Sequence, residues 1–418
     1  MRKILIVGAG QSGLQLALGL QSQGYEVTLM SNRTPDEIRS GRVMSTQCMF
    51  HTALQHERDL DINFWESQAP RIEGLGVSVA GPPAPDAPEG PSPRIVDWVG
   101  KLDGYAQSVD QRVKMAGWME TFAQRGGQLV IHGAAVSDLD FFARTYDLVL
   151  VSAGKGELVT MFGRDASRSP YDSPQRALAV TYVHGLGPRP EHPDYDAIRC
   201  NLVPGVGELF VMPTLTTSGR ADILFWEGIP GGPLDVFTGV KDPAQHLALT
   251  LELMKRFTPW EYARAGKVEL TDGGGTLAGR YAPVVRGPVG RLPSGGVVLG
   301  VADVVVANDP ITGQGSNSAS KCAASYLDSI VEHGDRPFDE TWMRNTFERY
   351  WATAQHVTKW TNAMLAPPPE HVLQLIGAAG QLQPVADRFA NGFDNPADFE
   401  NFFYDPEKAG AYLSSFGG

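Results

Sequence analysis

The sequence predicts an α/β fold in which a mostly parallel sheet is interrupted by a sheet-rich insertion and followed by a helical C-terminal region. The apolar run at residues 4–7 precedes a glycine-rich turn and a helical pattern, as expected of a strand buried on both faces. A second buried strand at residues 297–301 also leads into a glycine-rich turn and a helix. Between them, from about residue 167 to residue 279, short strands alternate with Gly and Pro turns.

The other elements follow from hydrophobic periodicity and turn residues. We expect helices over residues 14–20, 109–125 and 317–332 and after Pro369, and strands over residues 25–30, 128–132 and 147–151. Residues 81–93 are too rich in Pro and Gly for a helix or a central strand. We interpret them as a loop, and the sequence leaves open whether this loop covers a pocket.

Composition argues against several classes of partner. The chain of 418 residues has 35 Lys and Arg against 47 Asp and Glu, a net charge of −12, so we expect no nucleic-acid partner. No apolar run approaches the roughly 20 residues of a membrane span, and we expect no membrane partner and a cytoplasmic location. The cysteines Cys48, Cys200 and Cys322 lack metal-ligand spacing, and His51 and His56 do not share a helical face, so we expect no metal site.

The first glycine-rich turn, residues 8–13, matches the dinucleotide fingerprint. Gly8 permits the tight turn, Gly10 lets the backbone approach a pyrophosphate, and Gly13 lets helix and strand pack closely. Gln11 and Ser12 then lie in the first turn of a helix whose N-terminus faces the phosphates. An NAD-dependent dehydrogenase would carry the same fingerprint and is one alternative.

The second strand departs from the fingerprint. An acidic residue usually ends it and binds the ribose, but here Ser31, Asn32 and Arg33 follow Met30. Ser31 or Asn32 can hydrogen-bond a ribose, and Arg33 can pair with phosphate or stack on adenine. Arg33 is equally interpretable as a surface residue.

The second glycine-rich turn distinguishes FAD from NAD. Asp303 closes the stretch Gly-Val-Ala-Asp, and residues 309–317 read Asp-Pro-Ile-Thr-Gly-Gln-Gly-Ser-Asn. This resembles the Gly-Asp motif and its continuation in the para-hydroxybenzoate-hydroxylase-like fold. The resemblance implies that Asp303 binds the ribityl chain, that Pro310 packs beside the flavin ring and that a helix N-terminus faces the pyrimidine edge. The residues at this N-terminus are Gly313, Gly315, Ser316 and Asn317.

One motif of that fold is missing. Gly154 and Lys155 stand where NAD(P)H-using members carry Asp-Gly, and the Ser and Arg that should follow are absent. The nicotinamide-linked chemistry is therefore not expected in this chain. We predict that FAD is delivered already reduced by a separate NADH-dependent flavin reductase.

Together these features resemble the styrene and indole monooxygenases, the group E flavoprotein monooxygenases. Further matching stretches are residues 40–42, 109–112, 125–127, 207–208, 213–215 and, less closely, 359–362. The resemblance implies FAD contacts from Arg42, Arg112 and Val136, although Arg42 also fits a surface cation and Arg112 a helix ion pair. It implies no catalytic side chain, because the flavin carries the activated oxygen. A non-catalytic flavin-binding protein is a further alternative.

The resemblance also implies a domain division. Residues 1–165 and 280–335 form the split Rossmann FAD-binding domain, residues 166–279 the substrate domain and residues 336–418 a C-terminal helical region. We expect residues 70–95 to join the substrate domain. The sequence leaves the oligomeric state open, a homodimer included.

The substrate prediction depends on a short segment after Arg42. Ser45, Gln47 and Met49, together with Ala106, are similar to indole monooxygenases rather than to styrene monooxygenases, although each also fits an ordinary packing or turn role. We therefore expect a small aromatic substrate, with indole epoxidised at its 2,3-bond and styrene as the alternative. The predicted substrate-binding residues are Met44, Ser45, Gln47, Met49, Val211, Pro310 and Thr312.

Overall fold

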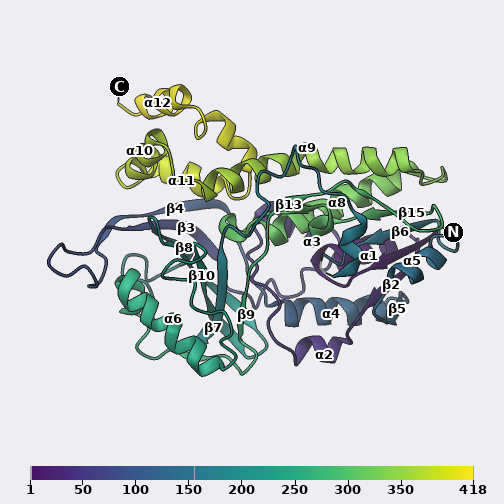
Figure 1. The fold of residues 1–418 in the computed structure, drawn as a ribbon, viewed down its shortest axis with the longest axis horizontal. Helices are drawn as coiled ribbons and strands as arrows, with labels where there is room; N and C mark the ends of the chain where they lie inside the picture. Colours follow the sequence, from purple (N-terminus) through teal and green to yellow (C-terminus); the bar gives the residue numbers. More distant parts are fainter. Residues whose placement is uncertain (1, 155, 418) are drawn as a thin grey trace.

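The computed structural model describes residues 2–154 and 156–417, arranged as two sheets beneath a layer of C-terminal helices (Figure 1). One sheet lies on the right of this view and is made by the two ends of the α/β region. The other lies on the left and carries α6 (Pro243–Phe257) on its outer side. The predicted fold class is confirmed.

The first sheet has the strand order β14-β15-β6-β1-β2-β5. Its strands are β1 (Lys3–Val7), β2 (Glu26–Ser31), β5 (Gln128–Ile131), β6 (Leu148–Val151), β14 (Val289–Arg291) and β15 (Val297–Gly300). All pairings are parallel except that of β14 with β15. Ile4, Leu5 and Ile6 are fully buried because helices cover both faces, which explains their uninterrupted apolar run. The carboxyl ends of the parallel strands consequently meet at one edge.

The second sheet has the order β11-β7-β10-β9-β8-β3-β4, with β12 also paired to β7. Its strands are β3 (Ile72–Ala80), β4 (Arg94–Ala106), β7 (Ala177–His184), β8 (Asp196–Val203), β9 (Gly207–Thr216), β10 (Gly219–Gly228), β11 (Glu269–Leu270) and β12 (Thr276–Gly279). A small ladder joins β13 (Val284–Val285) to β16 (Val306–Ala307). Neighbouring residues face opposite sides of the sheet. Leu209 and Val211 pack in the core with α6, while Phe210 and Met212 pack in the core shared with the C-terminal helices.

Helix α6 was not predicted, because the surrounding turns suggested only strands. Asp242 caps its first turn, and His246, Thr250, Leu253 and Phe257 are buried. This spacing of three and four residues is helical, but two of the five buried residues, which also include Met254, are polar, and this weakens the apolar pattern.

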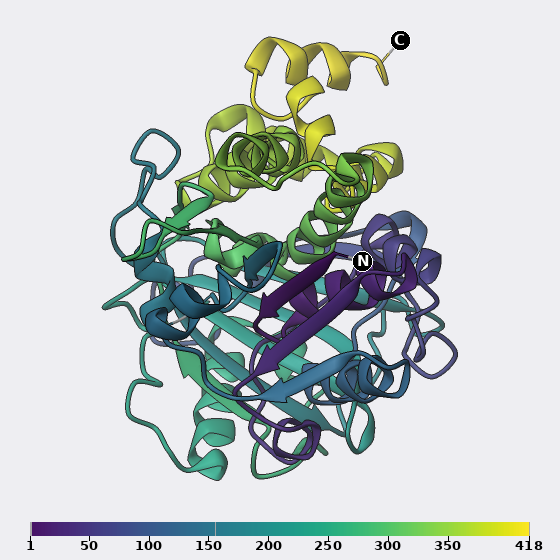
Figure 2. The ribbon, with the colours of Figure 1, turned by 90° about the vertical axis from the view of Figure 1, so that its right-hand side faces the viewer.

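The remaining helices connect and cover the sheets. They are α1 (Gln11–Ser22), α2 (Pro35–Arg39), α3 (His51–Asp59), α4 (Gln111–Gln124), α5 (Val136–Phe142), α7 (Pro259–Tyr262), α8 (Gly315–His333), α9 (Glu340–Leu365), α10 (Glu370–Ala379), α11 (Gln383–Asn391) and α12 (Pro406–Ser414). Short 3-10 turns are η1 (Glu157–Met161), η2 (Ala302–Val304), η3 (Pro310–Thr312) and η4 (Pro396–Asn401). Figure 2 shows the C-terminal helices above the first sheet, with α12 farthest from it. Among the residues described, no helix combines the length and apolar character needed to cross a membrane.

The predicted loop at residues 81–93 joins β3 to β4 and projects at the left end of Figure 1. It rests on the end of α6, where the Ser92 amide donates to the Arg256 carbonyl at 2.9 Å and Glu89 pairs with the Arg256 guanidinium. This end of the molecule lies beyond the second sheet, far from the first.

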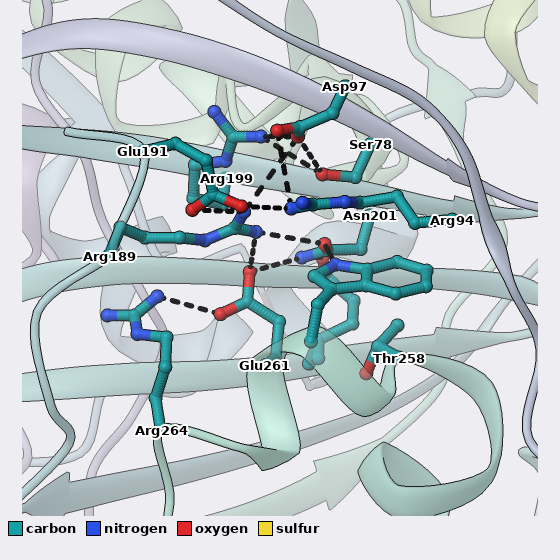
Figure 3. Close-up of polar contacts among 12 residues, drawn as sticks. Ser78, Arg94, Asp97, Arg189, Glu191, Arg199, Asn201, Thr258, Glu261 and Arg264 are labelled. Carbon is teal, nitrogen blue, oxygen red and sulfur yellow. Dashed lines mark hydrogen bonds and ion pairs between the residues drawn. The ribbon is translucent and has the colours of Figure 1, made fainter.

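Buried ion pairs hold the second sheet to α7. The Glu261 carboxylate, fully buried, accepts hydrogen bonds from Arg189, from Arg264 at 2.7 Å and from Asn201 at 3.1 Å, while Arg199 binds Asp97 (Figure 3). Breaking one partner of such a pair leaves an uncompensated charge, so the network ties the strands and the helix together.

A second buried pair links helices of the first sheet and yields a stability prediction. Lys114 of α4 donates to Glu57 of α3 at 2.5 Å, both side chains being at most 1% exposed. We expect Lys114→Met to lower the free energy of unfolding by about 3–5 kcal/mol, because Glu57 is left buried without its counter-charge. The double variant with Glu57→Leu should recover at least half of that loss in urea unfolding. A loss below about 1 kcal/mol in the single variant would contradict this assignment.

Candidate functional site

The two glycine-rich motifs meet at the carboxyl edge of the first sheet. Gly8 follows β1, and its carbonyl accepts a hydrogen bond from Ser152 Oγ, just after β6, at 2.7 Å. Two residues on, a Cβ placed on Gly154 would lie 2.9 Å from the Cβ of Asp303. Segments from opposite ends of the sequence therefore share one crevice, as open α/β sheets use for ligands.

Each of the three glycines of the first motif is needed for a different structural reason. Gly8 has φ +117°, which only glycine adopts readily, and a Cβ on Gly13 would lie 2.0 Å from the Gly8 carbonyl oxygen. These two glycines are required by the fold itself. A Cβ on Gly10 would meet no atom of the described residues within 4 Å, so its backbone borders open space on that side. Of these three positions, Gly10 is thus the one where the fold does not require glycine, and the approach of a ligand explains the absence of a side chain.

Two helix N-termini lie side by side at this crevice. The Gln15 side chain of α1 donates to the Ser320 carbonyl of α8 at 3.1 Å, which joins their second turns. Neither helix has a side-chain cap or an acidic residue in its first turn. Asp side chains cap α4, α6, α9 and α12, whereas α3 and α11 are uncapped like α1 and α8, so what distinguishes α1 and α8 is that their N-termini meet at the crevice. Uncapped amides at the positive ends of two helices form a favourable environment for an anionic ligand.

The other first-turn residues of α1 are turned inward. Gln11 donates to Glu57 at 3.0 Å and to Gln15 at 3.2 Å, and Ser12 is buried. Their side chains belong to the packing between helices, so what this turn presents to the crevice is its backbone.

The turn before α8 is also open. A Cβ on Gly313 or Gly315 would meet no atom within 4 Å, and Ser316 Oγ is buried with no hydrogen-bond partner among the described residues. Asp303 is exposed and follows Ala302, whose φ of +52° is unusual for a residue with a Cβ. Open backbone, an uncapped helix and an accessible carboxylate fit a flavin dinucleotide.

Asn317 joins this turn to the predicted substrate segment. Its side chain accepts from the Phe50 amide at 2.8 Å and donates to the Cys48 carbonyl at 2.8 Å. The position of residues 48–50 is thereby fixed relative to α8. The side chain is committed to the protein, so any ligand contact from Asn317 comes from its backbone.

Residues predicted for adenosine lie at the same edge with varied exposure. Ser31 Oγ donates to the Arg33 carbonyl at 2.7 Å, and Arg33 donates to the Met44 sulfur at 2.6 Å. Asn32 is exposed, and Val136 is half-buried at the start of α5. The structure therefore leaves Asn32 the most accessible polar side chain of this group.

The two predicted arginines differ sharply. Arg42 is exposed and donates to the Lys241 carbonyl at 3.4 Å. Arg112 is 2% exposed, binds Asp272 through two hydrogen bonds of 3.0 Å and binds Asp110 at 2.9 Å. It also donates to the Gly41 carbonyl at 3.3 Å. Arg112 is therefore not a free cation. It is held in buried ion pairs with Asp110 and Asp272, and it positions the loop that carries Arg42.

Tyr281 borders the crevice and was missed at the sequence level. Its hydroxyl donates to the Asn308 carbonyl at 2.6 Å while the residue stays 41% exposed. Burial of the hydroxyl raises the pKa of Tyr281, and the nearby carboxylates of Asp303 and Asp309 raise it further. An isolated tyrosine between turns has no sequence motif to signal it.

An apolar cavity lies behind the η3 turn, between the second sheet and the C-terminal helices. Its walls include Phe210, Ile311, Thr312, Trp360, Phe389 and Phe393. The cavity volume is about 20 Å³, which is room for about one water molecule. Aromatic side chains must therefore move before a ring can enter. Thr312 is the predicted substrate residue that lines this cavity, and its hydroxyl lies 2.7 Å from that of Thr361.

Other predicted substrate residues are not brought to this cavity. Val211 faces α6 on the opposite side of the second sheet, and Met49 packs with Ala53 and Leu54. Gln47 is buried and donates to the Val109 carbonyl. Ser45 is exposed, and its carbonyl accepts from the Tyr182 hydroxyl at 3.1 Å. The chain direction at residues 48–50 instead turns Cys48 and Phe50 toward the core that contains the cavity.

The open backbone at Gly10 gives a direct test of ligand approach. We expect Gly10→Ala to fold with unchanged melting temperature and to weaken FAD binding by roughly tenfold or more, because the methyl group occupies the path of the pyrophosphate. Gly163→Ala is the matched control, since its Cβ also meets no atom within 4 Å and the residue is exposed. Equal FAD affinities for both variants, measured by fluorescence titration, would contradict the assignment.

Comparisons with known proteins agree with this geometry. Residues 154–264 match the family described as the styrene monooxygenase A substrate binding domain. Styrene monooxygenase StyA from Pseudomonas sp and StyA from Pseudomonas fluorescens are each 30% identical to the chain, covering 99% of it and 98% of the relative. The flavin-dependent brominase Bmp2 has a similar fold, with a TM-score of 0.66 at 13% identity and coverage of 95% and 97%. The chain belongs to the styrene monooxygenase StyA family and is an FAD-dependent monooxygenase.

Proposed function

We propose that the protein is the oxygenase component of a two-component system that epoxidises a carbon–carbon double bond conjugated to an aromatic ring. The observation that carries the proposal is the meeting of two uncapped helix N-termini, α1 and α8, beside an apolar cavity. The first suits a dinucleotide pyrophosphate, and the second suits the negative charge of a reduced flavin ring.

Each part of the crevice has a proposed role toward FAD. The backbone of residues 8–13 receives the pyrophosphate, and the edge formed by Ser31, Asn32 and Arg33 receives the adenosine. Asp303 binds the ribityl hydroxyls. Pro310 and the amides of residues 313–317 position the ring, and an anionic ring is stabilised by the α8 N-terminus. When bound in its reduced form, FAD supplies two electrons and activates O₂.

The protein's further contribution is a dry cavity for the substrate. Ile311 and Thr312 connect the flavin-positioning turn to the aromatic residues Trp360, Phe389 and Phe393. These side chains exclude water from the place where oxygen transfer occurs, which protects activated oxygen from unproductive release. Transfer to an electron-rich double bond then requires positioning by the walls rather than a catalytic side chain.

A separate NADH-dependent reductase fits the region after β6. Ser152 is used inside the fold, bonding the Gly8 carbonyl, and Gly154 lies against Asp303. Lys155, the second residue of the atypical pair, lies outside the described residues. Because Gly154 lies against Asp303, the proposed ribityl-binding residue, we assign this turn to FAD binding and not to a nicotinamide cofactor.

Styrene is the first substrate candidate, because the curated relatives carry that name over the full length of the chain. Indole is the second, on the residues Ser45, Gln47, Met49 and Ala106. A specific observation favours a substrate that reaches beyond the cavity to the segment of residues 45–49: Gln47 Oε1 is buried with no hydrogen-bond partner among the described residues. An indole N–H is a donor for such an oxygen, and styrene has none.

A reconstituted assay tests the proposal. With FAD, NADH, O₂ and a flavin reductase, we expect epoxide from styrene and a lower kcat/KM for indole, whose product darkens to indigo. Without reductase, NADH should leave the FAD oxidised. Bleaching of FAD by NADH alone would contradict the two-component arrangement, and a higher kcat/KM for indole would make indole the substrate. The reductase without this chain is the control for free peroxide.

A further inference from the structure

Glu227 in β10 is a fully buried acid without a counter-charge of its own. The residue is 0% exposed, and neither carboxyl oxygen has a hydrogen-bond partner among the described residues. Glutamate is almost never fully buried unless it is paired, because an ionised carboxylate in an apolar interior is very costly. This position therefore calls for a chemical explanation.

The Figure 3 cluster shows what this chain does with a buried glutamate that stays ionised. Glu261 is equally buried, yet its oxygens accept hydrogen bonds from Arg189 and Arg264. Burial alone would raise the pKa of Glu261, but the two arginines hold it below the usual value. Glu227 has no such arrangement.

The groups around Glu227 are mostly acidic. Glu208 stands directly opposite it in the β9–β10 pairing, and Arg176 is committed to Glu208 through hydrogen bonds of 2.8 and 3.0 Å. Burial, then Asp309 and Glu208, raise the pKa of Glu227 well above its ordinary value, and Arg176 only partly opposes them. Burial likewise raises the pKa of Asp309 to about 6. Tyr281 also lies within electrostatic range of this group.

The position of Glu227 relates it to the reaction. Ile223, Phe225 and Glu227 alternate onto the face of the sheet that carries the cavity, where Phe210 lies opposite Phe225. Asp309 is 2% exposed and accepts from the Ile311 amide at 3.2 Å, at the start of the η3 turn. Asp309 thus caps the turn that positions the flavin and lies within electrostatic range of Glu227.

We propose that Glu227 is held as a neutral carboxylic acid and, with Asp309, supplies the proton that the monooxygenase reaction consumes. The inference rests on the epoxidase function proposed above. Anionic reduced FAD, O₂, an alkene and one proton give oxidised FAD, an epoxide and water. The flavin's two electrons reduce O₂; one oxygen atom bonds to the alkene, and the other leaves as water with the flavin hydrogen and this proton. In a site that excludes solvent, the proton must come from an internal acid, which is reloaded when the cavity opens.

The first test is spectroscopic and needs no turnover. The infrared difference spectrum between wild type and Glu227→Gln, without flavin at pH 7, should show the C=O stretch of a protonated carboxyl that is absent from the variant. Asp222→Asn is the matched control. Asp222 lies on the same strand but on the opposite face, and burial raises its pKa to about 7. Its variant should retain the Glu227 band. Absence of that band from the wild type overturns the proposal.

Stability gives a second readout with a defined sign. Because the folded-state pKa of Glu227 is raised above 4.5, the folded protein binds a proton that the unfolded chain releases. The contribution of Glu227 to wild-type stability is thus fully present below about pH 4.5 and is lost as pH rises toward the folded-state pKa. Glu227→Gln should lack this loss. The melting temperature of the variant minus that of the wild type should therefore increase as pH rises. A constant difference across pH contradicts a neutral Glu227.

The last test is a single turnover of pre-reduced FAD with O₂ and styrene. We expect Glu227→Gln to slow flavin reoxidation by roughly 10²-fold and to release more hydrogen peroxide, with Asp222→Asn matching the wild type. Epoxide from wild type with an unchanged rate in Glu227→Gln overturns the proton-supply role alone. No epoxide from wild type removes the epoxidase function and the proton supply with it, while the infrared band still decides the protonation of Glu227.

Discussion

The close packing of α1 against α8 is the constraint on which the site depends. The two helices come from opposite ends of the α/β region, and the hydrogen bond from Gln15 to the Ser320 carbonyl joins them. Their approach requires small side chains, because a Cβ on Gly19 would lie 2.7 Å from a methyl group of Leu327. This packing sets both uncapped N-termini beside Asp303. Separate helices would each offer a weak anion site, whereas together they form an extended crevice for one dinucleotide.

The second sheet and the C-terminal helices complete the site by closing it. The η3 turn precedes α8 directly, so Ile311 and Thr312 reach the apolar core while the turn itself faces the crevice. Trp360 of α9 forms the opposite wall of the cavity. A small, dry cavity next to a polar crevice is what oxygen transfer to an apolar double bond requires. Because the cavity is dry, solvent cannot readily deliver a proton to it, and this is why we assign proton supply to Glu227.

Much of the fold could be predicted because the first sheet is buried on both faces. The strands at residues 4–7, 25–30 and 147–151 are confirmed, and so is the helix at residues 317–332. Other features depend on partners distant in sequence. Arg112 is fixed by Asp272, 160 positions away, and no local pattern shows this. For Val211, the sequence leaves open which face of the sheet it occupies, and a shift of one residue reverses the answer.

Titration of the flavin-free protein with FAD and with ADP tests the central claim, that α1 and α8 hold the two halves of one dinucleotide. The account predicts one FAD per chain, displaced by ADP. Asp303→Asn should weaken FAD by roughly tenfold, consistent with about 1.5–3 kcal/mol for a hydrogen bond to a charged group, and should leave the ADP affinity unchanged, because ADP lacks the ribityl chain. Unchanged FAD affinity, or equal losses for FAD and ADP, would contradict the account.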